Sequence, residues 1–166
     1  MKKENLNIVD LVNNFGCFDL QFRKDVRHKR TGLPTYHRWK MQFIVTSQKE
    51  KMSLLQKLER EFKCGKISSS NEQARYSVQK IEDINKIIVP YFKKNNLENK
   101  KKSDFNLWQK AAGIIYANKG KSLLLWKRNE FLQLIEIQKS AIKYKQKPRA
   151  SKWINDAQDL AKTLKA

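Results

Sequence analysis

Acidic residues and cysteine are both scarce in this chain of 166 residues. It has 16 Asp and Glu against 36 Lys and Arg, which gives a formal net charge of +20. A compact chain with this excess repels itself unless a polyanion neutralises it, so we expect a nucleic acid as partner before an anionic surface. The two cysteines, Cys17 and Cys64, lack CxxC spacing, which excludes the usual zinc motifs and a disulfide framework.

Long hydrophobic runs are also missing. The run SLLLW is far shorter than the roughly 18 to 20 apolar residues that a membrane-spanning helix needs. The N-terminal MKKENLNIVD is basic and then amphipathic, without the apolar segment of a secretory signal. We therefore expect a soluble protein with no membrane partner, in a reducing compartment. The abundance of Lys, Asn and Ile is typical of AT-rich genomes and favours an organellar, mitochondrial location.

The apolar content is high enough for a folded protein. Hydrophobic residues make up 40% of the chain and include four Trp, which excludes disorder. The length suits one domain with a sizeable core. We predict a single domain over residues 1–166, with an αββαββα core at 4–97 and a helical C-terminal part at 104–166.

The first element is predicted to be a helix over residues 4–15. Its apolar residues recur at the i, i+3, i+4, i+7 spacing that places them on one helical face. The residues on that stripe are Ile8, Leu11, Val12 and Phe15.

Alternating apolar and polar residues then predict an antiparallel sheet. Strands are expected at 17–24 and 37–47, on either side of a basic loop at 25–36 that contains Gly and Pro. A helix with an N-terminal capping box is predicted at 47–65, and a hairpin at 66–79. The four strands and the intervening helix indicate an α+β fold with a four-stranded antiparallel sheet.

The remaining chain is predicted to be mainly helical. A short helix interrupted at Pro90 is expected at 81–94, and further helices are expected at 105–118 and 122–144. A final helix carries Trp153 on its apolar stripe. Residues 95–104, rich in lysine, are predicted to be a linker. These helices must cover the apolar side of the sheet, which leaves the opposite side open.

The open side of the sheet is predicted to bind nucleic acid. Arg and Gln make bidentate contacts to base edges, whereas Lys and Ser suit phosphates. An ordinary solvated face is the alternative, and the net charge of +20 favours the nucleic-acid surface. The residues predicted to line it are Gln21, Arg23, Arg38, Lys40, Gln42, Lys66, Ser68, Arg75, Ser77 and Gln79.

The element order and several segments resemble the single-motif LAGLIDADG homing endonucleases. The resemblance implies a saddle-shaped sheet in the DNA major groove, a homodimer joined through the first helices, and an acid at the foot of each first helix that binds Mg²⁺ for phosphodiester cleavage. The segments that carry it are IVDLVNNFGCF, FIVTSQKEKMSLLQKLEREFKCGKI, IEDINKIIVPYFKK, KKKSDFNLWQKAAGII and EFLQLIEIQ.

The chain departs from the family pattern at its catalytic positions. The acid before the glycine corresponds to Phe15, which has no oxygen to offer the hard Mg²⁺ ion. The family's glutamine on the second strand falls at Ile44, and the expected basic residue is retained as Lys100 or Lys101. We therefore expect no metal or other cofactor. We expect Phe15 instead to complete the buried stripe of the first helix.

The seam of the family's dimer is altered as well. The small residues four apart correspond to Asp10 and Asn14. Asp10 would meet its own symmetry mate in a buried interface, where like charges cost several kcal/mol. We therefore do not expect the usual homodimer.

These observations predict a catalytically inactive LAGLIDADG-derived protein that binds structured RNA, as a group I intron splicing factor or as part of a mitochondrial ribonucleoprotein such as the ribosome. The alternatives are a site-specific DNA endonuclease, as a homodimer or with a partner supplying the acid, and a repressor of duplex DNA. Further phosphate contacts are predicted at Arg27, Lys29, Arg30, Lys100, Lys101, Lys102, Lys145, Lys147 and Arg149.

Overall fold

The computed structural model describes residues 7–25, 36–145 and 153–166. Its order is helix, two strands, helix, two strands and then helices, as the sequence predicts. The elements are α1 (Ile8–Phe15), β1 (Gly16–Asp25), β2 (Tyr36–Gln48), η1 (Lys49–Lys51), α2 (Met52–Phe62), β3 (Lys66–Ser69), β4 (Gln73–Val78), α3 (Ile81–Asp83), η2 (Ile84–Ile88), α4 (Val89–Lys94), α5 (Asn99–Ala117), η3 (Leu123–Leu125), α6 (Arg128–Ala141), η4 (Ile142–Tyr144) and α7 (Ile154–Thr163).

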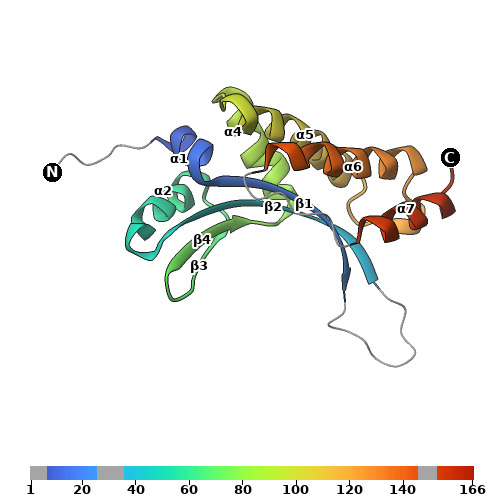
Figure 1. Ribbon diagram of the computed structural model, residues 1–166, viewed down its shortest axis with the longest axis horizontal. Helices are drawn as coiled ribbons and strands as arrows, with labels where there is room; N and C mark the ends of the chain where they lie inside the picture. The colour runs from blue at the N-terminus through green and yellow to red at the C-terminus, as the bar shows by residue number, and fades with distance from the viewer. Residues whose placement is uncertain (1–6, 26–35, 146–152) are drawn as a thin grey trace.

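The four strands form one antiparallel sheet in the order β1-β2-β4-β3, so β1 and β3 are its edges. The sheet is curved, and the helices lie on its convex side while the concave side is open (Figure 1). The predicted α+β fold with a saddle-shaped sheet and additional C-terminal helices is confirmed.

The alternation in the strands fixes which side of the sheet is buried. Phe18 pairs with Phe43 across β1 and β2, and both side chains point to the helical layer. Trp108 of α5 packs on Phe18 with ring centroids 5.1 Å apart, and its indole N–H donates to the Asp19 carbonyl. The side chains that the sheet buries are Phe18, Leu20, Phe22, Trp39, Met41, Phe43, Val45, Ala74, Tyr76 and Val78.

Helix α2 packs on β4 through Leu55, Leu58 and Phe62. It begins later than predicted because β2 continues through Gln48. The Ser47 hydroxyl donates to the Gln48 carbonyl and caps no helix, so the predicted capping box is wrong.

The chain turns from α2 into β3 through Gly65. Its φ is 84°, and a Cβ there would lie 2.8 Å from the Ser77 carbonyl oxygen, so only glycine fits without strain.

The predicted linker at 95–104 is wrong in its second half, because α5 begins at Asn99. One helical stripe runs through Asp104, Phe105, Trp108 and Ala111, and all four are buried. Packing of this stripe on β1 offsets the weak helical tendency of a lysine-rich first turn. No described helix is both long enough and apolar enough to cross a bilayer.

The chain is helical throughout 81–94, as α3, the π-helical segment η2 and α4 in direct succession, so the interruption predicted at Pro90 is wrong. Pro90 lies in the first turn of α4, directly after the π-helical segment. The π-helical turn brings both Ile84 and Ile88 into the core.

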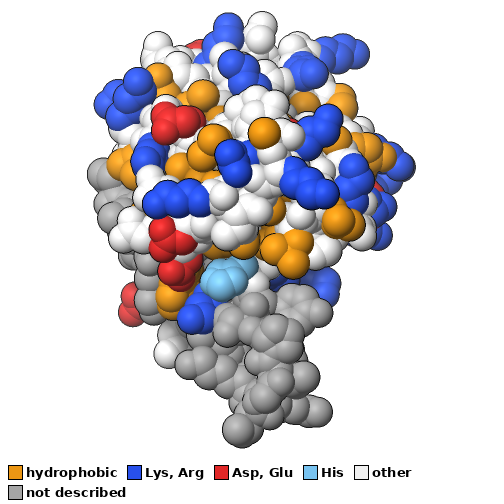
Figure 2. Space-filling view, turned by 90° about the vertical axis from the view of Figure 1, so that its right-hand side faces the viewer, with side chains coloured by type: hydrophobic (Ala, Val, Ile, Leu, Met, Phe, Trp, Pro, Cys, Tyr) orange, Lys and Arg blue, Asp and Glu red, His pale blue; other side chains and the backbone are white. Residues whose placement is uncertain are grey.

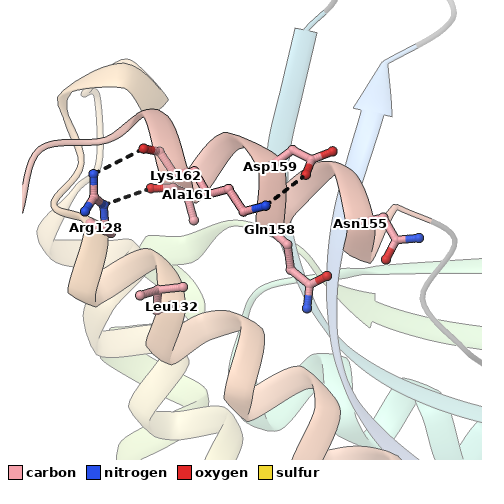
Figure 3. Close-up of a pocket in the computed structure, with 7 residues that line it drawn as sticks. All are labelled: Arg128, Leu132, Asn155, Gln158, Asp159, Ala161 and Lys162. Carbon is pink, nitrogen blue, oxygen red and sulfur yellow. Dashed lines mark hydrogen bonds and ion pairs between the residues drawn. The ribbon is translucent and has the colours of Figure 1, made fainter.

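Helix α7 is held against α6 by Arg128. Its Nε and Nη2 donate to the carbonyls of Ala161 and Lys162, at 3.2 and 3.1 Å (Figure 3). The Ala161 carbonyl also accepts from the Leu164 backbone N–H, and the arginine adds a second donor there and complements the negative end of the helix dipole. The groove between the two helices, lined by Leu132 among others, is therefore crossed by the contacts of Arg128 that hold α7 against α6.

Candidate nucleic-acid interface

The concave face is built by the strand register. Side chains directly opposite each other in an antiparallel pair point to the same side. The polar residues predicted on the strands therefore form one continuous surface, here called the concave face. The register pairs Gln21 with Lys40, Arg23 with Arg38, Lys66 with Ser77 and Ser68 with Arg75.

Cations are crowded at the β1–β2 part of the concave face. Arg23 lies directly opposite Arg38, an arrangement that destabilises a sheet unless an anion intervenes. Burial lowers the pKa of Lys40, and the charges of Arg23, Arg38 and Arg75 lower it further. The cluster therefore gains from a polyanion that screens its mutual repulsion.

Gln42 lies at the centre of the concave face but is only 5% exposed. Its Oε1 accepts hydrogen bonds from Arg75 Nη2 and from Gln79 Nε2, each at 3.2 Å. A guanidinium can only donate, so Arg75 fixes which end of the Gln42 amide carries the oxygen. Gln42 was predicted to touch nucleic acid; the structure instead buries it beneath Arg75 and Gln79.

The face also includes residues that the prediction left out. Asp19 lies opposite Gln42, and burial raises the pKa of its carboxyl against the opposing effect of Lys145. Ile44 lies between Cys17 and Ser77. The period of two in β1 already assigns Asp19 to this side, but its acidity made it an unexpected member of a phosphate-binding surface.

Phe15 lies at the foot of α1, and its side chain is 49% exposed. The prediction that it completes the buried stripe is therefore wrong. Gly16 packs against Val12 so closely that a Cβ would lie 2.6 Å from Val12 Cγ1. The chain enters β1 directly at this glycine, so Phe15 is the last residue of α1 and its side chain stays at the surface.

Lys101 reaches the same point from α5. Its ammonium donates to the Gly16 carbonyl, and burial lowers its pKa. Asn13 also ties the two elements together, since its Oδ1 accepts from the Glu98 backbone N–H at 3.0 Å. Of the two lysines that the resemblance offered, Lys101 lies at the foot of α1, whereas Lys100 is exposed on α5.

Lys145 does not fit its predicted role as a phosphate contact. Its ammonium lies 2.9 and 3.0 Å from the two carboxylate oxygens of Asp104 and also donates to the Phe18 carbonyl. These three acceptors match the three N–H groups of a lysine. Asp104 is 2% exposed and was not anticipated, although its place on the α5 stripe could have indicated it.

The side chains at the foot of α1 do not fit a Mg²⁺ site. Phe15 supplies no oxygen ligand where the resemblance expects a carboxylate. Within residues 7–25, 36–145 and 153–166, no three His, Cys, Asp or Glu side chains cluster as a metal would require. The remaining predicted contacts lie outside the described residues: Arg27, Lys29, Arg30, Lys147 and Arg149.

Comparison with known proteins gives a consistent family match. A family model described as LAGLIDADG endonuclease matches residues 11–112, which is more than half of the chain. No curated protein matches the sequence.

Three of the similar solved structures are homing endonucleases. I-SmaMI bound to an uncleaved DNA target is 25% identical, with a TM-score of 0.72 over 92% of this chain. The homing endonuclease I-TnaI is 18% identical, with a TM-score of 0.70 over 93% of this chain and 95% of its own. I-GzeII in complex with its DNA target is 22% identical, with a TM-score of 0.66 over 94% of this chain. The chain spans about half of the I-SmaMI and I-GzeII chains, 49% and 48%.

Proposed function

The chain belongs to the LAGLIDADG endonuclease family, and on that premise we propose that it is a catalytically inactive member that binds structured RNA. The observation that carries the proposal is the cluster of Arg23, Arg38 and Lys40 on an open sheet, where Asp19 is the one nearby acid in the described chain that acts on Lys40. Among the described residues, the side chain at the foot of α1 is Phe15, which offers a metal no ligand. Binding chemistry is present, whereas the chemistry of metal-assisted hydrolysis lacks its ligand.

The proposed loss of cleavage rests on Phe15. Metal-assisted phosphodiester hydrolysis needs oxygen ligands to hold the ion and activate water. An exposed phenyl ring stands at the position where the resemblance expects the acid, and it has no oxygen with which to hold the ion. The concave face, by contrast, needs no metal to bind phosphates.

The spread of positive charge favours folded RNA over duplex DNA. A duplex lying on the concave face cannot reach the helical layer, yet exposed lysines continue there. Figure 2 shows Lys and Arg side chains distributed over the end of the molecule that carries α7. A folded RNA can contact several sides of a protein at once. Exposed lysines on α4 and α5 are Lys93, Lys94, Lys100, Lys102 and Lys110.

The proposed setting is the mitochondrion, with a ribosomal RNA or a group I intron as ligand; its support is the Lys, Asn and Ile content. The test is ultraviolet crosslinking of the tagged protein in cells, followed by sequencing of the attached nucleic acid. Reads on ribosomal RNA would identify a structural subunit, and reads on intron RNA a splicing factor. Recovery of duplex DNA without RNA would contradict the proposal.

Duplex DNA is the second candidate ligand because I-SmaMI and I-GzeII are described with DNA targets. A working endonuclease would need a partner chain that supplies the acid, or a homodimer that accepts Asp10, which is exposed on α1. Mg²⁺-dependent cleavage of long duplex DNA, by the protein alone or with an organellar extract, would favour this candidate. Tight binding to one duplex sequence without cleavage would indicate a repressor.

A further inference from the structure

An open cavity of ≈ 690 Å³ follows the outer edge of β1. β1 has a partner strand on one side only, and the cavity lies between its other side and residues of α5, α6 and η4. The cavity extends from Phe15 at the foot of α1 to Arg23 near the far end of β1. It is thus continuous with the cationic cluster of the concave face.

Aromatic rings line the cavity. Phe15, at 49% exposure, is a large apolar surface left in water. Tyr144 and Trp153 are partly buried on the wall, and the Lys24 ammonium lies 5.6 Å from the centroid of a Trp153 ring. Aromatic rings that border an open cavity can stack on a planar ligand.

Lys101 places a positive charge near the exposed ring of Phe15. The Lys101 ammonium donates to the carbonyl of Gly16, the residue that follows Phe15. This bond uses one of three N–H groups, and an anionic oxygen can accept from another. Two carboxylates also line the cavity: Asp104 is paired with Lys145, and burial raises the pKa of Asp19. Near Phe15 the wall therefore combines an aromatic face with a cation.

We infer that this cavity binds an unpaired nucleotide of the RNA, with its base stacked on Phe15 and its phosphate near Lys101. The inference rests on the proposed function and extends it to a second contact beside the concave face. The volume lies in the range of roughly 300 to 1,000 Å³ that holds small ligands. A paired helix hides the faces of its bases, whereas loops and bulges can turn a base outward onto an aromatic side chain.

The test compares two RNA hairpins that share one stem, of which only one carries a single-uridine bulge. The wild-type protein is expected to bind the bulged hairpin about tenfold more tightly, which is within the range for stacking of one base. Phe15→Leu should abolish this preference, and Phe15→Trp should retain it. Leu125→Ala is the matched control, because Leu125 is 72% exposed and lies outside the cavity.

Crosslinking gives a second readout. The bulged uridine is replaced by 5-iodouridine, which bonds on irradiation to an aromatic side chain stacked on it, and the modified peptide is mapped by mass spectrometry. A crosslink to Phe15 supports the inference. Equal binding of both hairpins by the wild type, with no crosslink at Phe15, would overturn it and leave the RNA proposal standing. Failure to bind either hairpin or any mitochondrial RNA would overturn both.

Discussion

Arg75 on the concave face is held by Gln42, a residue beneath it on the neighbouring strand. The two side chains are joined by a hydrogen bond of 3.2 Å from Arg75 Nη2 to Gln42 Oε1, and the acceptor residue is 5% exposed. An arginine anchored in this way has already lost part of its rotamer freedom before a ligand arrives. Gln42 is thus a positioning residue for Arg75.

Removal of the Gln42 acceptor should weaken RNA binding, because Arg75 is then no longer held in place. Gln42→Leu keeps the approximate size but frees the guanidinium, and the cost should be about 1 kcal/mol, the entropy of ordering one long side chain. Filter binding of wild type, Gln42→Leu, Arg75→Ala and the double variant forms a double-mutant cycle. In the Arg75→Ala background, Gln42→Leu should have little further effect.

The control for that cycle is Gln133→Leu on α6, where the glutamine is exposed on the helical side. It should change binding little. If Gln42→Leu weakened binding equally in both backgrounds, Gln42 would be acting on the sheet as a whole. Thermal unfolding of each variant separates such a structural effect from the loss of positioning.

The depressed pKa of Lys40 predicts a dependence of binding on pH. Burial and the neighbouring arginines lower this pKa in the free protein, whereas a phosphate in the complex raises it. Binding should therefore take up protons at alkaline pH, and affinity should fall as the pH rises through the pKa of free Lys40. Arginine stays charged throughout, so Lys40→Arg should lose less affinity between pH 7 and 9.5.

Calorimetry in buffers of different ionisation enthalpy measures that proton uptake directly. The same RNA is used for both proteins, so titration of its own bases cancels in the comparison. Parallel loss of affinity in wild type and Lys40→Arg would contradict a role for Lys40 at the interface.

Local periodicity carried most of the fold prediction. A period of two in β1 and β2 indicated both the strands and the polar side, because alternate side chains must point to opposite faces. The same reasoning failed at Phe15. A helical period says which residues share a face, but it does not say where the chain leaves the helix, and here Gly16 turns it into β1 one residue later.

The sequence patterns do not predict contacts between residues that lie far apart in the chain. Asp104 and Lys145 are separated by 41 positions. Asp104 follows a lysine-rich stretch and Lys145 begins a basic segment, so neither local sequence indicates a buried ion pair. The pattern that indicates the burial of Asp104 is the apolar stripe of α5, which continues from Trp108 and Phe105 back to Asp104 and Lys101. Composition suggested a linker because the exposed lysines masked these inward positions.

The ion pair between Asp104 and Lys145 should contribute to stability, because its loss leaves the partly buried Lys145 ammonium without its carboxylate. Asp104→Ala is expected to cost about 1–3 kcal/mol in the free energy of unfolding. The cost stays below that of breaking a fully buried pair because the Lys145 side chain is 21% exposed and can turn towards water. Urea unfolding followed by Trp fluorescence measures the change.

A double variant tests whether the pair or its separate charges matter. Asp104→Leu combined with Lys145→Met removes both charges and keeps the volume, so it should recover most of the stability that Asp104→Ala loses. If the double variant were as unstable as Asp104→Ala, the hydrogen bond from Lys145 to the Phe18 carbonyl would be the more important contact.

Arg128 should control how firmly α7 is docked. Arg128→Ala removes two side-chain donors from the last carbonyls of α7 and should cost about 1–2 kcal/mol, confined to this helix (Figure 3). Native-state hydrogen exchange should show faster exchange in α7 and unchanged protection in β2, because the sheet does not depend on this contact.

Lys162→Ala is the matched control, since Lys162 pairs only weakly with Asp159 at 3.9 Å on the exposed side. Unchanged protection of α7 in Arg128→Ala would show that Ala157, Ala161 and Leu164 dock the helix without the arginine.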